Sequence, residues 1–114
     1  MEQVSTEIYN YFNSLSVFTD VMGDRIFPLI ALEETDFPFS IYKIEQQRGL
    51  SKDADGFDVT LFAYFGPQNY KEAVAFNDAV RQQLDSSRYQ YLDSSIDFID
   101  ENQSIVLVLT FKKE

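Results

Sequence analysis

The sequence predicts a small α+β domain in which an antiparallel sheet carries helices on one face. Three observations predict this class. Residues 57–65 alternate as a strand does, residues 69–85 carry a helix-like apolar stripe, and strand-like sequence stands on both sides of them. The 114 residues suit a single domain spanning residues 1–114.

The chain is predicted to begin with an amphipathic helix from about Gln3 to Leu15. Its apolar residues recur at spacings of three and four, which is the helical period. A turn at Gly23–Asp24, a short extended piece at Arg25–Phe27 and a stop at Pro28 follow. The apolar positions of the helix are Val4, Ile8, Tyr11, Phe12 and Leu15.

An antiparallel hairpin is predicted next. Residues 39–47 are rich in aromatic and β-branched side chains, and residues 57–65 alternate between two faces. The polar segment between them contains Asp55-Gly56, a pair that suits the positive-φ positions of a hairpin turn.

The longest predicted helix follows Gly66-Pro67. Asn69 stands at its start and Glu72 three residues later, as in a capping box. Ala73, Phe76, Val80 and Leu84 lie on one face, which is expected to cover the sheet.

Two closing strands complete the predicted sheet. Residues 88–99 are expected to be broken or bulged near Asp93–Ser95, and residues 104–112 are apolar on both faces, with a turn between. The order is therefore α-β-β-β-α-β-β, with about four main strands, and with the N-terminal helix and one long central helix packed on one face.

A sheet with helices on one side leaves its other face to be covered. Several large apolar residues fall on faces of mixed character, which is typical of a surface that meets a partner. The alternative, that the N-terminal segment, loops and curvature cover this face within one chain, stays open. Arg25 is expected either to pair with Asp24 and lock the turn or to form an ion pair between subunits. The candidate subunit interface comprises Arg25, Tyr42, Phe62, Tyr64, Val106 and Val108.

The composition argues against most chemistry. Histidine and cysteine are absent, which removes the commonest general base, thiolate sites and disulfides. We therefore expect no enzymatic activity, no cofactor and no metal, and the lack of cysteine favours an intracellular origin. With nine basic and nineteen acidic residues, the net charge of −10 argues against nucleic-acid and anionic-membrane binding. No signal peptide or transmembrane stretch is expected.

The polar segment between the hairpin strands concentrates oxygen ligands, which raises the question of a calcium loop. In a loop that starts at Asp53, the glycine at position 56 comes two residues too early for an EF-hand, and the twelfth position would be Tyr64, which offers no carboxylate. We interpret this segment as a hairpin connection that becomes ordered on assembly. This candidate assembly loop comprises Arg48, Gly49, Leu50, Ser51, Lys52, Asp53, Ala54, Asp55 and Gly56.

Several segments together resemble the phage tail-completion, or tail-terminator, family of minor tail components that join head and tail. They are "GDRIFP", "PFSIYKI", the hairpin at Gly49–Phe57 and "VTLFAYFGPQNYKEAVAFNDAVRQQLDS". The two closing strands agree in placement, so the resemblance runs from about Val21 to Lys112. These positions determine a fold and carry no catalytic signature.

The resemblance implies a structural role with no enzymatic activity. Members of such families form homomeric rings, typically hexameric, that cap the tail tube and meet the head connector. It implies the virion tail as location, after assembly in the host bacterial cytoplasm. Arg25, Pro28 and Pro38 would be structural residues at the starts of strands, and Arg48–Asp58 a contact arm. An acidic ring would also let DNA slide through without binding it.

A second class of function remains open beside this one. A small acidic regulatory or immunity-type module would dock a basic partner through its carboxylates. A ring or a six-subunit mass would favour the tail protein, whereas a monomer at every concentration would favour the binding module.

Overall fold

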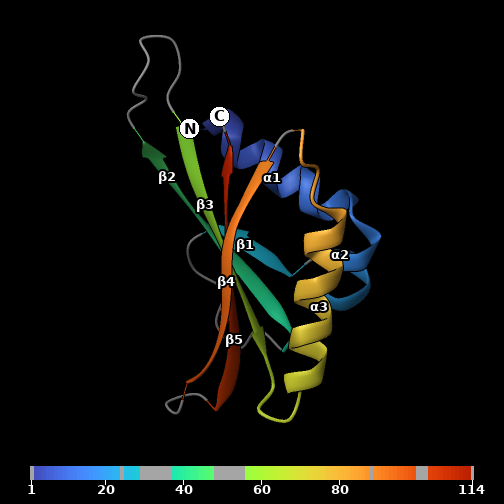
Figure 1. Ribbon diagram of the computed structural model, residues 1–114. Coiled ribbons are helices and arrows are strands. Elements are labelled where there is room, and N and C mark those ends of the chain that lie inside the picture. Colours follow the sequence, from blue (N-terminus) through green and yellow to red (C-terminus); the bar gives the residue numbers. More distant parts are fainter. Residues whose placement is uncertain are drawn as a thin grey trace.

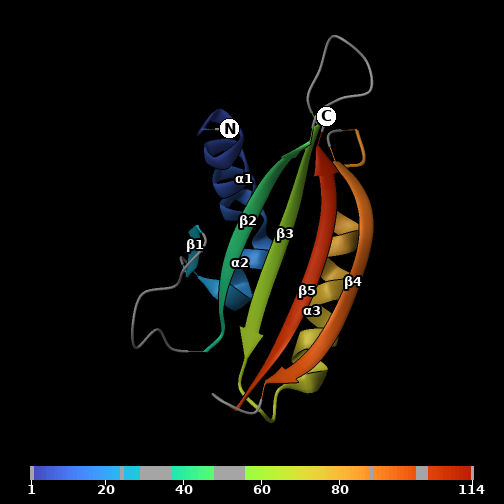
Figure 2. The same ribbon diagram turned by 90° about the vertical axis from the view of Figure 1, so that its left-hand side faces the viewer.

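The computed structural model describes residues 2–23, 25–28, 37–47, 56–87, 89–99 and 103–113. It contains one sheet with the strand order β1-β2-β3-β5-β4. Three helices cover one face of this sheet, and the other face carries none of them (Figure 1). We call the face without helices the outer face; Figure 2 looks onto it. The predicted α+β class with helices on one side is confirmed.

The four main strands form two antiparallel hairpins, β2–β3 and β4–β5, which are joined in sequence through α3 and pair side by side through β3 and β5. The strands are β2 (Phe39–Gln47), β3 (Gly56–Phe65), β4 (Tyr89–Ile99) and β5 (Ser104–Lys113). β2 and β5 flank β3, and β4 pairs with β5 at the end of the sheet. A register shift between Tyr91 and Asp93 marks the bulge expected near Asp93–Ser95.

The short strand expected before the hairpin is present and adds a fifth strand to the sheet. β1 (Ile26–Pro28) pairs with residues 40–42 of β2 and runs parallel to it. The backbone amide and the hydroxyl of Ser40 both donate to the carbonyl of Arg25, at 2.9 and 3.1 Å. The guanidinium of Arg25 donates from Nε to the carbonyl of Pro38 at 2.6 Å. The extended piece expected near Arg25–Phe27 is thus tied to the start of β2.

The N-terminal region contains two helices where one was expected. α1 (Glu2–Ser14) is followed by Leu15, whose backbone is extended, and then by α2 (Ser16–Met22). Phe18 and Met22 of α2 are completely buried, so this short helix belongs to the core. The region after Leu15 contains the β-branched Val17, Thr19 and Val21, which weakened its helical signal in the sequence.

The central helix agrees with its prediction except at its first turn. α3 (Tyr70–Gln83) buries Ala73, Phe76 and Val80 against the sheet. Asn69 is the N-cap residue, but its side chain makes no capping hydrogen bond. If residue 66 carried a Cβ atom, that atom would lie only 2.8 Å from Oδ1 of Asn69. A larger residue at position 66 would therefore require the Asn69 side chain to move.

Aromatic rings join the three helices to the sheet. Phe12 of α1 lies 5.0 Å from Phe18 and 5.9 Å from Phe111, measured between ring centroids. Phe18 in turn contacts Phe76 of α3 at 5.6 Å, and Phe76 contacts Phe65 at 5.7 Å. The core is one continuous cluster between the helices and the inner face of the sheet.

Replacing Tyr11 with phenylalanine is expected to lower the free energy of unfolding by about 1–2 kcal/mol. The Tyr11 hydroxyl donates to the carbonyl of Gln83 at 3.1 Å and accepts from the amide of Asp85 at 2.8 Å. These groups lie at the carboxyl end of α3, and the variant removes this oxygen from a side chain that is 8% exposed. Urea denaturation of Tyr11→Phe tests this, and an unchanged midpoint would contradict it.

Candidate functional site

The outer face can be described as four rows of side chains that run across β2, β3, β5 and β4. The rows follow from the pairing registers, because alternate residues of paired strands point to the same face. In strand order they are Phe39–Tyr64–Val106–Asp97, Ile41–Phe62–Val108–Ser95, Lys43–Thr60–Thr110–Asp93 and Glu45–Asp58–Lys112–Gln90.

The first two rows are apolar on β2, β3 and β5 and end in Asp97 and Ser95 on β4; we call these two rows the apolar half. Here Phe39, Tyr64 and the preceding Phe37 stack with nearly parallel rings, at centroid distances of 5.6 and 4.9 Å. Phe37 remains 39% exposed, while Val106 is only 6% exposed because larger side chains flank it. Partial burial raises the pKa of the Tyr64 phenol above its ordinary value. Within the described part of the chain, no helix or strand lies over this half.

The last two rows form a polar half with charges of both signs. Lys43 and Glu45 form an ion pair at 3.0 Å on β2, with both side chains about half exposed. Asp58 and Lys112 are direct partners on β3 and β5. Asp93 is exposed on β4, at the opposite end of the row from Lys43. The outer face thus changes from apolar to charged along the strand direction.

The structure brings four of the six predicted interface residues together. Phe62, Tyr64, Val106 and Val108 are neighbours on the apolar half. Their part in a subunit interface stays a prediction.

The prediction that Tyr42 belongs to the subunit interface is wrong, because this residue lies on the face that the helices cover. It pairs with Leu61, is 4% exposed, and its hydroxyl shares a 3.0 Å hydrogen bond with Ser5 of α1. The pairing register of β2 with β3 decides this point: Ile41 opposes Phe62, so Ile41 takes the place expected for Tyr42.

Arg25 lies outside the outer-face rows, beside β1. Its guanidinium contacts carbonyls of its own chain, those of Pro38 and, from Nη2 at 3.5 Å, Val21. The expected partner Asp24 lies outside the described residues. The structure therefore gives Arg25 a role in holding the start of β2, and its role between subunits stays a prediction.

The candidate assembly loop is described only at its last residue. Residues 48–55 lie outside the described part of the chain. Gly56 is the first residue of β3 and is buried, and a Cβ atom there would lie 3.3 Å from Cε of Lys112. The described residues that border it, Gln47 and Gly56, pair with each other at the polar end of the sheet.

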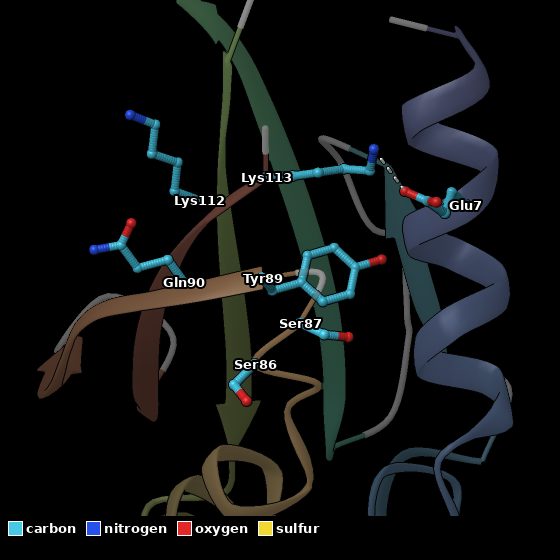
Figure 3. A pocket seen from close by; sticks show the side chains of 7 residues that line it. All are labelled: Glu7, Ser86, Ser87, Tyr89, Gln90, Lys112 and Lys113. Atoms are coloured by element: carbon cyan, nitrogen blue, oxygen red, sulfur yellow. Dashed lines mark ion pairs between the residues drawn. The ribbon is translucent and has the colours of Figure 1, made fainter.

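A polar depression of about 450 Å³ lies where α1 meets the sheet (Figure 3). Lys113 forms an ion pair with Glu7 at 3.3 Å inside it, and Lys112 points away from that pair. The remaining lining residues are Ser86, Ser87, Tyr89 and Gln90. The ion pair engages the Glu7 carboxylate and the Lys113 ammonium group with each other within the chain.

The described residues contain no arrangement typical of a metal site. No group of three or more histidine, cysteine, aspartate or glutamate side chains is gathered among them. None of the described helices has the length and apolar character needed to cross a membrane. The outer face is therefore the strongest candidate for a functional surface.

Comparison with known proteins gives a likeness of fold. No protein-family description and no curated protein matches the sequence. Among solved structures, the chain is similar to a chain in the virion of a native gene transfer agent particle, with a TM-score of 0.76. The two are 11% identical, and the match covers 93% of this chain and 89% of the other. The likeness thus extends over almost the whole of both chains.

Several residues of the outer face were absent from the predicted interface. Phe39 and Ile41 complete the apolar rows, and Lys43 and Asp93 close the third row at its two ends. The alternation of residues 39–47 already placed Phe39 and Ile41 on one face. The missing signal was the register between strands, which decides which alternating set faces the helices.

Proposed function

We propose that this chain is a structural component of a phage-type virion, where it assembles with copies of itself. The single observation that carries the proposal is the near-complete likeness of fold to a chain of a gene transfer agent virion. The apolar half of the outer face supports it independently, because large uncovered apolar patches are typical of surfaces that meet another protein.

In the finer form of the proposal, the chain makes a homomeric ring that caps the tail tube and joins it to the head connector. The resemblance of residues 21–112 to tail-completion proteins supports this form. A ring needs each copy to contact its neighbours, and the apolar half supplies a surface for this. The net charge of −10 suits a ring through which DNA slides without binding. Its location would be the virion tail.

Removal of the gene tests this function. In the genetic element that encodes the chain, a null allele is expected to yield heads and tails that fail to join, seen by electron microscopy. A copy of the wild-type gene supplied in trans should restore joined particles. Particles that form normally and carry DNA to recipient cells without the gene would contradict the proposal.

A small binding module that docks a basic partner is the second candidate. The excess of acidic over basic residues favours it, and Asp93 and Asp97 are exposed on the edge strand β4. In this case the isolated chain would remain a monomer at every concentration, and capture of a basic protein would depend strongly on salt.

A further inference from the structure

We propose that the free chain forms a two-fold dimer in which the outer faces of two copies pack against each other. The axis would run along the strands, between β3 and β5. The inference goes beyond the proposed function, because it concerns the chain before it enters any particle. It would keep the apolar half covered until assembly.

The arrangement follows from the order of the strands on the outer face. A two-fold rotation about this axis places β4 of the second copy over β2, and β5 of the second copy over β3. It leaves each row at the same height along the strands. Each row therefore meets the same row of the second copy, read in the opposite order.

The charges of the polar half are complementary under this rotation. In the third row, Lys43 meets the second copy's Asp93, and the symmetry repeats this pair. In the fourth row, Asp58 meets the second copy's Lys112. Glu45 meets Gln90, which is uncharged. No two like charges of these rows face each other. Like charges that face each other across an interface would weaken the association.

The apolar half is complementary on the two central strands. Phe62 meets Val108, and Tyr64 meets Val106, so apolar side chains cover apolar side chains there. At the edge, Ile41 meets the second copy's Ser95, and Phe39 meets Asp97, whose carboxylate can reach water at the rim of the contact.

A two-fold axis across the strands at the centre of these rows would instead place the apolar rows over the charged rows, with Glu45 over Phe39 and Lys43 over Ile41. That arrangement desolvates more charged side chains without opposite charges than the axis along the strands does, which disfavours it.

The size of the contact indicates a reversible dimer. Four strands and four rows cover on the order of 500 Å² on each copy, from the usual spacings of strands and residues. A total on the order of 1,000 Å² is at the lower limit of specific interfaces. Facing sheets usually cross at about 30°, which moves the paired residues at the edges of the contact apart. The long lysine side chains can span this separation.

The experiment reverses the charges one at a time and then combines the variants. Lys43→Glu places a second carboxylate opposite Asp93, and Asp93→Lys places a second ammonium group opposite Lys43. Either variant alone is expected to raise the dissociation constant of the dimer by about tenfold or more, as measured by sedimentation equilibrium. An equimolar mixture should form a mixed dimer with a dissociation constant near that of the wild type, because both of its cross-copy pairs are again opposite in sign.

Thermal unfolding checks that each variant is folded. If one is not, Asp58→Lys and Lys112→Glu form a second pair for the same mixing experiment. A monomeric wild type, single variants that associate as the wild type does, or a mixture that associates no better than its components would each overturn the inference. So would a mixed species of more than two chains. None of these outcomes depends on whether the chain is a virion component, which the null allele tests separately.

Discussion

Replacing Phe12 with alanine is expected to lower the free energy of unfolding by about 3–5 kcal/mol. Phe12 is completely buried and its ring contacts Tyr11, Phe18 and Phe111, which belong to α1, α2 and β5. The substitution leaves a cavity at the point where these elements meet. Because small domains are stable by only about 5–15 kcal/mol, a large part of the stability should be lost.

Urea denaturation followed by circular dichroism measures this loss. Tyr9→Ala is the matched control, since Tyr9 lies on the same helix and is 40% exposed. The control is expected to change the free energy of unfolding by less than about 0.5 kcal/mol. If the two variants unfold at the same urea concentration, the aromatic cluster does not hold the helices to the sheet as described.

Replacing Val108 with aspartate is expected to abolish self-association while leaving the chain folded. Val108 lies in the apolar half between Phe62 and Ser95 and is only partly buried within one chain. A carboxylate there stays hydrated in a monomer but would be desolvated, without a partner, in an assembly. We expect the dissociation constant to rise by about a hundredfold or more.

Light scattering coupled to size-exclusion chromatography gives the mass of each species. Ala75→Asp is the matched control, because Ala75 is exposed on α3, away from the outer face. The control should associate as the wild type does. An unchanged mass for Val108→Asp, with wild-type solubility, would show that the outer face is no interface.

The fold class could be predicted because its signals are local. The alternation of residues 57–65 defines β3, and the stripe of Ala73, Phe76 and Val80 defines α3. Such periodicities survive in a single sequence because each follows from the geometry of its own element. The irregularity predicted near Asp93–Ser95 likewise lies close to position 92, where the register of β4 with β5 shifts.

The parts that could not be predicted depend on contacts distant in sequence. In the parallel pairing of β1 with β2, Ile26 is the partner of Ser40, and no local sequence pattern predicts this pairing. The face occupied by Tyr42 depends on the register of β2 with β3, and a shift by one residue would reverse it.

The short helix α2, in contrast, did leave a local signal in the sequence, because Leu15, Phe18 and Met22 have helical spacing.

The same dependence on register explains why the candidate surface was only partly predicted. The apolar character of Phe62 and Val108 was visible in the sequence, but the ordered rows were not. Only the pairing of all four strands shows that Lys43 and Asp93 stand at opposite ends of one row. The self-complementary arrangement of charges is therefore a property of the folded sheet.

The mass of the isolated chain, measured by native mass spectrometry over a range of concentrations, tests most directly whether this protein assembles with itself. The account predicts a two-chain species that grows at the expense of the single chain as the concentration rises, and that disappears in Val108→Asp. A single-chain mass at every concentration would contradict it.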